Sequence, residues 1–387
     1  MPEEATIQVN TTDDEYNSDG DCSLREAVRA ANTNSPVDAC SPGGVSDTIL
    51  LPQGVYLLSI TGTDDNALTG DLDILGDLVI RGEFNETTIV DGGGIDRVFH
   101  IAAAGVVQFE NLTIQNGNVT TSLLGGGGIL NEVGDLTLKK VILQSNTTTA
   151  VGGGMDNAAT VTLIDTTVKE NEADDGGGIF NGGTLLLYNS SLYGNTAMTD
   201  TGGGLDNAGI STLQNVTISG NYAVAGGGIF SDGPLYMVNV TVVTNTAFNI
   251  DKGGNIENAD TLRIKNTVVA NSASGLNCAG NGDWVSEGHN LESTDTCNFS
   301  SAGDLTNVAS FSVGLLDDNG GPTLTHALPP DSPAIDAGDN LDCSEKDQRG
   351  ASRPVDGDGN TSKICDIGSV EYNGTFPTLL YLPLTVR

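Results

Sequence analysis

A six-residue block that returns six times is the feature that most constrains how this chain can fold. Each copy opens with glycines, and all but one close with asparagine, at intervals of 26, 24, 26, 24 and 27 positions. The copies are residues 126–131, 152–157, 176–181, 202–207, 226–231 and 253–258. A fixed period of this length is typical of a solenoid, in which each repeat stacks on its neighbours.

Short strands follow each block. Two alternating apolar runs, such as Leu136/Leu138 and then Val141/Leu143, show the period of two that indicates β-structure. A coil this long is too short for a four-stranded propeller blade and has no helical face. We therefore predict an all-β fold, a parallel β-helix whose coils each contain about 25 residues.

Two rows of asparagine recur with the same period. The first row is Asn146, Asn171, Asn195, Asn221, Asn245 and Asn271, and the second is Asn111, Asp165, Asn189, Asn215, Asn239 and Asn266. We interpret both as turn chemistry rather than as a metal or sugar array, because asparagine can bond its own backbone and the next coil. Six residues after the glycines are predicted to stack inside: Ile129, Met155, Ile179, Leu205, Ile229 and Ile256.

A β-helix must cover its ends, because a bare terminal coil exposes core and unpaired strand edge. The N-terminal region 1–60 is predicted to be such a cap. It contains a short alternating strand at Thr6–Asn10, then Ser23 and Glu26 as a capping box that opens an amphipathic helix over 23–31. We expect coils over 61–300, a loop-rich C-terminal cap over 301–373 and an apolar tail over 374–387.

The six cysteines fall into three local couples, separated by 18, 19 and 22 residues: Cys22/Cys40, Cys278/Cys297 and Cys343/Cys365. They lack CxxC spacing, and His100, His289 and His326 do not complete a zinc pattern. We predict three disulfides and an oxidising compartment, with buried free thiols as the alternative. Since Met1–Glu4 has neither a basic nor an apolar leader, export would require a signal removed upstream.

The charge of −36, from 15 Lys+Arg and 51 Asp+Glu, narrows the possible partners. A field of this sign repels phosphate backbones and anionic lipid, so nucleic-acid binding is excluded as a leading hypothesis. Polyanionic glycans such as pectin are disfavoured as substrates for the same reason. Apolar runs fall short of the 18 or so residues that span a bilayer, so we expect no membrane insertion.

The terminal motifs carry a family resemblance. Residues 21–27, which read DCSLREA, resemble the N-terminal CSLREA domain of bacterial secreted proteins. Ser332–Gly338, Asp347–Gly350 and Cys365–Gly368 are similar to the choice-of-anchor Q region of the same proteins. The resemblance implies a right-handed parallel β-helix, secretion and cell-surface display, and it implies no settled activity. In the C-terminal region we interpret Asp336 and Arg349 as buried pairing groups.

Enzymatic activity is the main question that the fold leaves open, because β-helices also host polysaccharide lyases and hydrolases. A lyase that acts on uronates needs clustered cations, but the basic residues of the coils are scattered: Lys139, Lys140, Lys169, Lys252, Arg263 and Lys265. An inverting hydrolase needs two facing carboxyl groups, for which Asp174 and Asp175 are candidates. We identify no catalytic and no cofactor-binding residues and favour a non-enzymatic protein.

Calcium is the ion that the sequence favours. Asp356, Asp358 and Asn360 space their oxygens as the start of an EF-hand loop does, although position 12 is Ile367 instead of glutamate. A second oxygen-rich turn contains Asp13, Asp14, Asp19 and Asp21. The alternative for both is a solvated acidic loop, and no other cofactor is expected.

A row of hydroxyl side chains is predicted to line one outer face, one per coil: Thr113, Thr167, Ser191, Thr217 and Thr241. Such a row could bind ice or a regular polymer, or it could be an ordinary solvent-facing strand surface.

The tail, residues 374–387, is unexpectedly apolar for so acidic a chain and has one charge. Its candidate assembly residues are Phe376, Leu379, Leu380, Tyr381, Leu382 and Leu384. The tail could pack along its own β-helix, or it could add as a strand to a neighbouring molecule and form head-to-tail filaments.

These features together predict a secreted or cell-surface protein with a structural or adhesive role, able to self-associate and to contact a surface glycan. The alternatives are a polysaccharide-active lyase or glycoside hydrolase, and a glycan- or ice-binding module.

Overall fold

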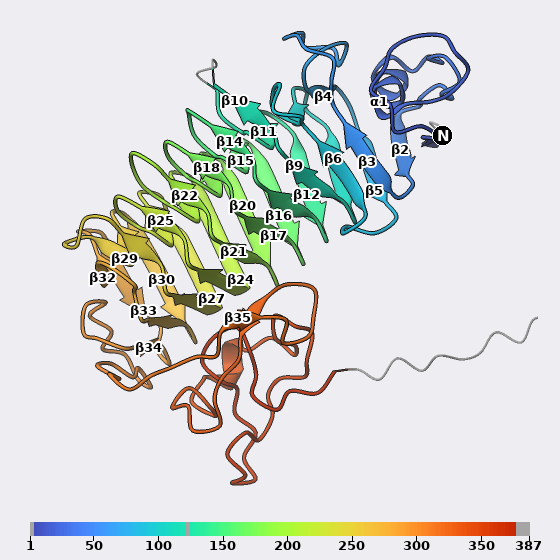
Figure 1. The fold of residues 1–387 in the computed structure, drawn as a ribbon. Coiled ribbons are helices and arrows are strands. Elements are labelled where there is room, and N and C mark those ends of the chain that lie inside the picture. The colour runs from blue at the N-terminus through green and yellow to red at the C-terminus, as the bar shows by residue number, and fades with distance from the viewer. Residues whose placement is uncertain (1–3, 121–123, 377–387) are drawn as a thin grey trace, which may run out of the picture.

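The computed structural model describes residues 4–120 and 124–376, and it shows a parallel β-helix with a single curved stack of coils (Figure 1). The longest of its sheets has 19 strands, and neighbouring coils pair in parallel. The strands of this long sheet are β1 (Glu4–Gln8), β2 (Ser46–Leu51), β3 (Gly54–Leu57), β5 (Leu78–Gly82), β6 (Thr88–Asp91), β8 (Val106–Glu110), β9 (Thr113–Gln115), β12 (Asp135–Lys139), β13 (Ile142–Gln144), β16 (Thr160–Ile164), β17 (Thr167–Lys169), β20 (Thr184–Tyr188), β21 (Ser191–Tyr193), β24 (Ile210–Ser219), β27 (Leu235–Val243), β30 (Thr261–Lys265), β31 (Val268–Ala270), β33 (Asp283–Ser286) and β34 (Leu291–Glu292).

Two further sheets complete the coils, as the period predicted. The nine-stranded middle sheet contains β4 (Leu72–Ile74), β7 (Phe99–Ile101), β11 (Ile129–Asn131), β15 (Met155–Asn157), β19 (Ile179–Asn181), β23 (Leu205–Asn207), β26 (Ile229–Ser231), β29 (Gly253–Asn258) and β32 (Leu276–Ala279). The six-stranded short sheet contains β10 (Asn118–Val119), β14 (Thr147–Thr148), β18 (Glu172–Ala173), β22 (Thr196–Ala197), β25 (Tyr222–Ala223) and β28 (Thr246–Ala247).

The repeated block places one aliphatic side chain of each coil in the core. Ile129, Met155, Ile179, Leu205, Ile229 and Ile256 are all fully buried, as predicted. The glycines before them are required by close backbone approach: a Cβ on Gly127 would lie 2.6 Å from the carbonyl oxygens of both Gly153 and Thr147. Stacking identical positions buries apolar area continuously along the axis, which is the main stabilising contribution in a solenoid.

Asparagine ladders run through the interior. Asn146, Asn171, Asn195 and Asn221 each donate from Nδ2 to the Oδ1 of the next asparagine at 2.9–3.0 Å. The prediction that Asn271 ends this ladder is wrong. Asn245 donates instead to Asn255 Oδ1 at 3.0 Å, and Asn255 donates to Asn277 Oδ1 at 3.1 Å. In the last block Asn255 replaces the third glycine, and its side chain takes the ladder position.

The second predicted asparagine row has the turn function expected of it. Its members adopt left-handed backbone conformations, with φ between 48° and 55°: Asn111, Asp165, Asn189, Asn215, Asn239 and Asn266. Asparagine and aspartate tolerate this region better than other residues with a Cβ, because their side chains bond locally. The row therefore marks a bend of the long sheet, which lies between two strands at four members and within β24 and β27 at Asn215 and Asn239.

Helix α1 (Leu24–Thr33) covers the N-terminal end of the stack (Figure 1). Ser23 caps it, and the predicted capping box with Glu26 is present. Asn32 pairs with the free edge of β4, since its Nδ2 donates to Asp73 O at 2.7 Å and its Oδ1 accepts from Leu75 N at 3.0 Å. One side chain thus satisfies strand groups that a further coil would otherwise pair. The long sheet begins earlier than residue 61, because β1, β2 and β3 already belong to it.

The C-terminal end of the stack is covered by residues 292–311. Leu305 bridges to Leu291, the Cys278–Cys297 disulfide ties this loop to β32, and Phe299 packs on the core. Residues 314–376, which we call the lateral segment, then turn back along the side of the β-helix (Figure 1). Its described elements are the hairpin β35 (Leu316–Asp317) and β36 (Thr325–His326) and the 3₁₀ helix η1 (Asn340–Asp342). Within the described residues, no helix has the length and apolarity to cross a membrane.

Candidate functional site

The hydroxyl row is buried, so the prediction of an open threonine face is wrong. Thr113 Oγ1 donates to Asn85 O at 2.6 Å, and the lateral segment covers Thr217 and Thr241. Ser191 and Thr217 are fully buried, and Thr241 is 5% exposed. Thr217 Oγ1 donates to Gln348 Oε1 at 2.6 Å, and Ser369 N donates to Thr241 Oγ1 at 3.0 Å. These hydroxyls bind the chain's own C-terminal region, which leaves them no surface for ice or a polymer.

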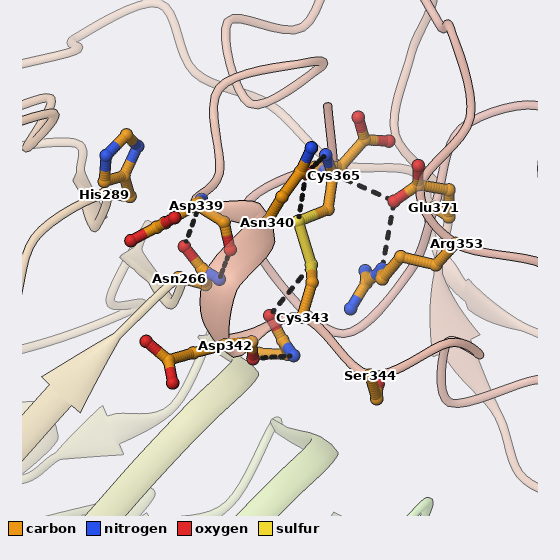
Figure 2. Close-up of a disulfide and its surroundings, with 12 residues drawn as sticks. Asn266, His289, Asp339, Asn340, Asp342, Cys343, Ser344, Arg353, Cys365 and Glu371 are labelled. Carbon is orange, nitrogen blue, oxygen red and sulfur yellow. Dashed lines mark hydrogen bonds and ion pairs between the residues drawn. A yellow bond between two sulfur atoms is a disulfide. The ribbon is translucent and has the colours of Figure 1, made fainter. Parts of the chain in front are cut away.

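Figure 2 shows how the lateral segment is held together and fixed to the coils. The Cys343–Cys365 disulfide joins its two halves, and the other predicted couples, Cys22–Cys40 and Cys278–Cys297, are also bonded. Asn266 exchanges two hydrogen bonds with the backbone of Asp339, at 2.8 and 3.0 Å. Arg353 and Glu371 form an ion pair at 2.9 Å in which both side chains are fully buried.

The predicted calcium loop lies on the lateral segment. Asp336 joins Asp356 and Asp358, and one oxygen of each lies within 4.8 Å of the others. Most of these oxygens already accept backbone donors: Asp356 Oδ1 accepts from Gly359 N at 2.8 Å, and Asp336 Oδ2 accepts from Asp358 N at 2.7 Å. Asn360 closes the loop by donating to Asp358 Oδ2 at 2.9 Å. Calcium binding here stays a prediction.

The acidic turn at Asp13–Asp21 and the apolar tail are the other two candidates from the sequence. In the acidic turn, Asp14 pairs with Arg25 at 2.6 Å, while Asp19 and Asp21 cluster with Glu15. Of the tail, Phe376 lies under the Arg349 guanidinium, 5.6 Å from it. Arg349, which we interpreted as a pairing group, pairs with Asp347 at 2.7 Å. The remaining assembly residues, Leu379, Leu380, Tyr381, Leu382 and Leu384, lie outside the described residues, so assembly stays a prediction.

Asp174 and Asp175 do not form a facing pair. Thr201, on the next coil, lies between Asp175 and Asp206. Its Oγ1 is 3.1 Å from Asp175 Oδ1 and 2.6 Å from Asp206 Oδ2, and both carboxylate oxygens accept from it. Burial, reinforced by the charge of Asp175, raises the pKa of Asp206 to about 8. Because Asp206 is only 3% exposed, this carboxyl pair is closed to a polymer substrate.

A cleft at the N-terminal shoulder of the coils has the features of a ligand site. Its volume is about 430 Å³, and acidic and polar side chains line it from the loop before β4, the loop before β7 and strand β10. The lining residues are Thr63, Asp64, Asp65, Asp71, Ile95, Asp96, Arg97, Asn118, Val119 and Thr120. Concave sites of this size with a few converging polar groups are typical of small-molecule and glycan binding.

Two polar atoms of this cleft are buried without a partner among the described residues. They are Nε of Arg97, a residue that is 9% exposed, and Oδ1 of Asn118. Buried donors and acceptors are nearly always bonded, and leaving one unpaired costs about 1–3 kcal/mol. Both atoms belong to cleft-lining residues, one a donor and the other an acceptor, which is what a hydroxyl-bearing ligand would satisfy.

Asp71 lies beside Arg97, with 3.3 Å between Oδ2 and Nη1, and it is 3% exposed. Burial raises the pKa of Asp71 to about 7, reinforced by the charges of Asp73 and Asp96 and opposed by those of Arg97 and His100. Burial likewise raises the pKa of Asp96. The cleft therefore contains a carboxyl group whose pKa lies well above the ordinary value of aspartate.

His100 is held between two carboxylates. Its Nδ1 lies 3.1 Å from Asp73 Oδ1, and its Nε2 lies 3.3 Å from Glu132 Oε2. Burial opposes the imidazolium, but the hydrogen bonds to these two carboxylates help raise the pKa of His100. Both ring nitrogens therefore lie beside carboxylates, and one of them also lies within 4.8 Å of Asp65 and Asp73 oxygens.

The N-terminal cap shapes the cleft. Arg25 is fully buried and donates from Nη2 to Gly70 O at 2.9 Å and from Nη1 to Ala67 O at 3.3 Å. Asp14 completes the arrangement, because its Oδ2 accepts from the backbone nitrogens of Ser59 and Ile60 at 2.6 and 2.9 Å. Arg25 and Asp14 therefore fix the loop between β3 and β4, which forms one wall.

Sequence reasoning missed this site. Asp65, Asp71 and Asp96 belong to the irregular coils before the first glycine block, where the repeat gives no register. His100 completes no zinc pattern, so its sequence context does not single it out. One feature of the sequence could have indicated the site. Asp71, Asp73, Asp96, Arg97 and His100 are charged or titratable, and stacking of neighbouring coils brings them together.

Comparisons with known proteins assign no family. No family model matches the chain. A stretch of 136 residues, 35% of this chain, is 29% identical to metabotropic glutamate receptor-like protein P of Dictyostelium discoideum and spans 9% of that protein. The crystal structure of pectate lyase Pel9A aligns over 96% of this chain and 97% of its own, with a TM-score of 0.48 and 15% identity. The resemblance to CSLREA and choice-of-anchor Q proteins therefore stays a prediction.

Proposed function

We propose that the protein is an extracellular surface module that binds a neutral glycan in the cleft between Asp71, Arg97 and Asn118. The observation that carries this proposal is the pair of buried, unpartnered atoms, Arg97 Nε and Asn118 Oδ1. Sugar hydroxyls both donate and accept, so one ligand class satisfies both atoms. The three disulfides support an oxidising, extracellular location.

The negative charge of the cleft favours neutral glycans over anionic ones. Asp64, Asp65, Asp71 and Asp96 line it together with one cation, Arg97. Uronate or sulfate groups would meet repulsion there and across a chain of net charge −36. The glycan-binding alternative of the sequence analysis is thus the one that the geometry supports, and a polyuronate lyase is the least supported.

Calorimetric titration with neutral oligosaccharides of several linkages, and with an oligouronate, tests the proposal. We expect binding of a neutral ligand and none of the uronate. Asn118→Ala and Arg97→Lys each remove one unpartnered atom, so each is expected to weaken binding about 5- to 10-fold, the equivalent of one hydrogen bond.

Thr147→Ala is the matched control, because Thr147 faces Asn118 in the neighbouring coil of the short sheet and does not line the cleft. It should bind as the unmodified protein does. Failure of every neutral glycan to bind, or equal weakening by Thr147→Ala, would refute the assignment of the cleft.

A further inference from the structure

A histidine and two carboxylates gather at the edge of the cleft, in a group that the proposed glycan binding does not use. Oxygens of Asp65 and Asp73 and one nitrogen of His100 all lie within 4.8 Å of one another. His100 Nδ1 lies 3.1 Å from Asp73 Oδ1. Ligand atoms that lie about 2 Å from a tetrahedral metal ion are about 3.3 Å apart, so this spacing suits two ligands of one ion.

Regular strands hold two of these side chains in place. Asp73 of β4 and His100 of β7 are partners in the parallel register of the middle sheet, so their side chains point to the same face on adjoining coils. Asp73 Oδ2 accepts from Ala67 N at 2.8 Å, which fixes the carboxylate and leaves Oδ1 towards the imidazole. The two groups are therefore positioned before any ligand binds.

The third side chain, Asp65, belongs to the loop between β3 and β4. Its neighbour Asp64 folds this loop, because the Asp64 carboxylate accepts from Leu68 N at 3.1 Å and from Thr69 N at 2.6 Å. Asp65 itself is exposed on the wall of the cleft. Solvent and ions can therefore reach the group from the side of Asp65.

The contacts of His100 are those of a metal-binding histidine. Its Nε2 lies 3.3 Å from Glu132 Oε2, and metal-binding histidines almost always donate their second ring N–H to a carboxylate or a carbonyl. A neutral imidazole that donates to Glu132 turns its Nδ1 lone pair towards Asp73 Oδ1. These two acceptors then need either a metal ion or a second imidazole proton between them.

An independent observation in the adjoining cleft points to a further ligand. Asp65 and Arg97 line the same cleft, and Arg97 Nε is buried without a partner among the described residues, in a residue that is 9% exposed. A donor at this place can pair with a water or hydroxyl oxygen that completes the coordination of an ion.

We propose that Asp65, Asp73 and His100 bind one divalent ion of the zinc class, with an oxygen ligand on the side of the cleft. Zinc takes tetrahedral sets of imidazole nitrogens and carboxylate oxygens, whereas calcium takes oxygen ligands. The ion offsets two carboxylates, of which Asp73 is fully buried. The site does not require the proposed glycan binding.

The test is a calorimetric titration of zinc chloride into the full disulfide-bonded chain, after treatment with a chelator and with no glycan present. We expect one zinc ion per chain and a melting temperature that rises with zinc concentration. Asp65→Asn and His100→Gln should each weaken zinc affinity about 100-fold or more, since losing a partner of a ligand already costs 10- to 100-fold. With Co²⁺ in place of zinc, we expect a visible absorption band that His100→Gln abolishes.

Asp19→Asn is the matched control, because Asp19 is an exposed member of a group made of carboxylates alone. It should leave zinc affinity unchanged. Absence of one-to-one zinc binding would overturn the proposal and would indicate an imidazolium between two carboxylates. Zinc binding that Asp65→Asn and His100→Gln leave unchanged, or that equimolar calcium displaces, would also overturn it. Because Asp65 is exposed, Asp65→Asn keeps the test valid even if replacing His100 impairs folding. Failure of glycans to bind would refute the proposed function and leave the metal site standing.

Discussion

Two rows of outward-facing side chains recur with the same period, one on the long sheet and one on the middle sheet. They differ in charge and in the part of the chain that satisfies them. The hydroxyl row of the long sheet (Thr113, Thr167, Ser191, Thr217 and Thr241) is neutral and lies largely under the lateral segment. One register of the middle sheet contains Asp73, His100, Asp156, Asp206 and Glu257, which we call the acidic row, and it also contains Leu130, Phe180 and Phe230. The members of the acidic row are also buried, but local loops satisfy them: Gly125 N donates to Asp156 Oδ2 at 3.2 Å, and Gly253 N donates to Glu257 Oε2 at 2.8 Å.

The two rows differ in how easily their polar groups can be buried and hydrogen-bonded. Hydroxyls donate and accept without charge, so a second layer of chain can pair them at little desolvation cost. Carboxylates bury poorly, and burial raises the pKa of Asp156 to about 6 and that of Asp206 to about 8. The lateral segment therefore packs on the hydroxyl row. The N-terminal end of the acidic row lies beside the cleft.

The largest expected effect comes from breaking the cover of the hydroxyl row. Arg353→Met should destabilise the lateral segment by about 3–5 kcal/mol, because it leaves Glu371 as a buried charge without its partner. Hydrogen exchange should then rise at Thr217 and Thr241 before the coils unfold.

Arg263→Met is the matched control, since Arg263 and Glu287 form an ion pair that is nearly half exposed on each side. It should change stability by less than about 1 kcal/mol. Exchange that stays slow at the hydroxyl row in Arg353→Met would show that the row is protected without the lateral segment.

The next prediction concerns the acidic row and the pH dependence of the free energy of unfolding. Asp206 holds a proton more tightly in the folded chain than in the unfolded one, so its stabilisation is complete below about pH 4 and is lost as pH rises through about 8. Between these limits one retained proton makes stability fall by about 1.4 kcal/mol per pH unit. Asp206→Asn should reduce the slope of denaturation free energy against pH.

Asp251→Asn serves as the exposed control for that slope and should leave it unchanged. A slope in Asp206→Asn that equals that of the unmodified protein would mean that Asp206 is not the carboxyl that titrates.

The smallest effect tests a single contact of the hydroxyl row. Thr217→Val removes the donor to Gln348 Oε1 and should cost about 1–2 kcal/mol in urea denaturation. Thr162→Val, at a half-buried outward position of β16, should change stability by less than about 0.5 kcal/mol. Equal effects of the two substitutions would show that the row gains nothing from its cover.

Sequence reasoning succeeded for features that the local pattern of residues determines. The inward aliphatic stack, the turns at Asn189 and Asn215 and the Ser23 capping box all follow from local pattern, and the structure confirms them. It failed at irregular places: Asn255 replaces the third glycine of the last block and takes the ladder position that we expected of Asn271. The cleft lies in the early coils, where no block sets the register.

The sequence by itself therefore determined the β-helix, its interior and its three cysteine couples, because these depend on periodicity and on neighbours close along the chain. Only the tertiary structure decided what lies over each outer face. Contacts such as Gln348 with Thr217, or Arg25 with Gly70, join residues 131 and 45 positions apart. Since strand period tells which side chains face outward and not what packs on them, the covered threonines and the open acidic cleft could be distinguished only in three dimensions.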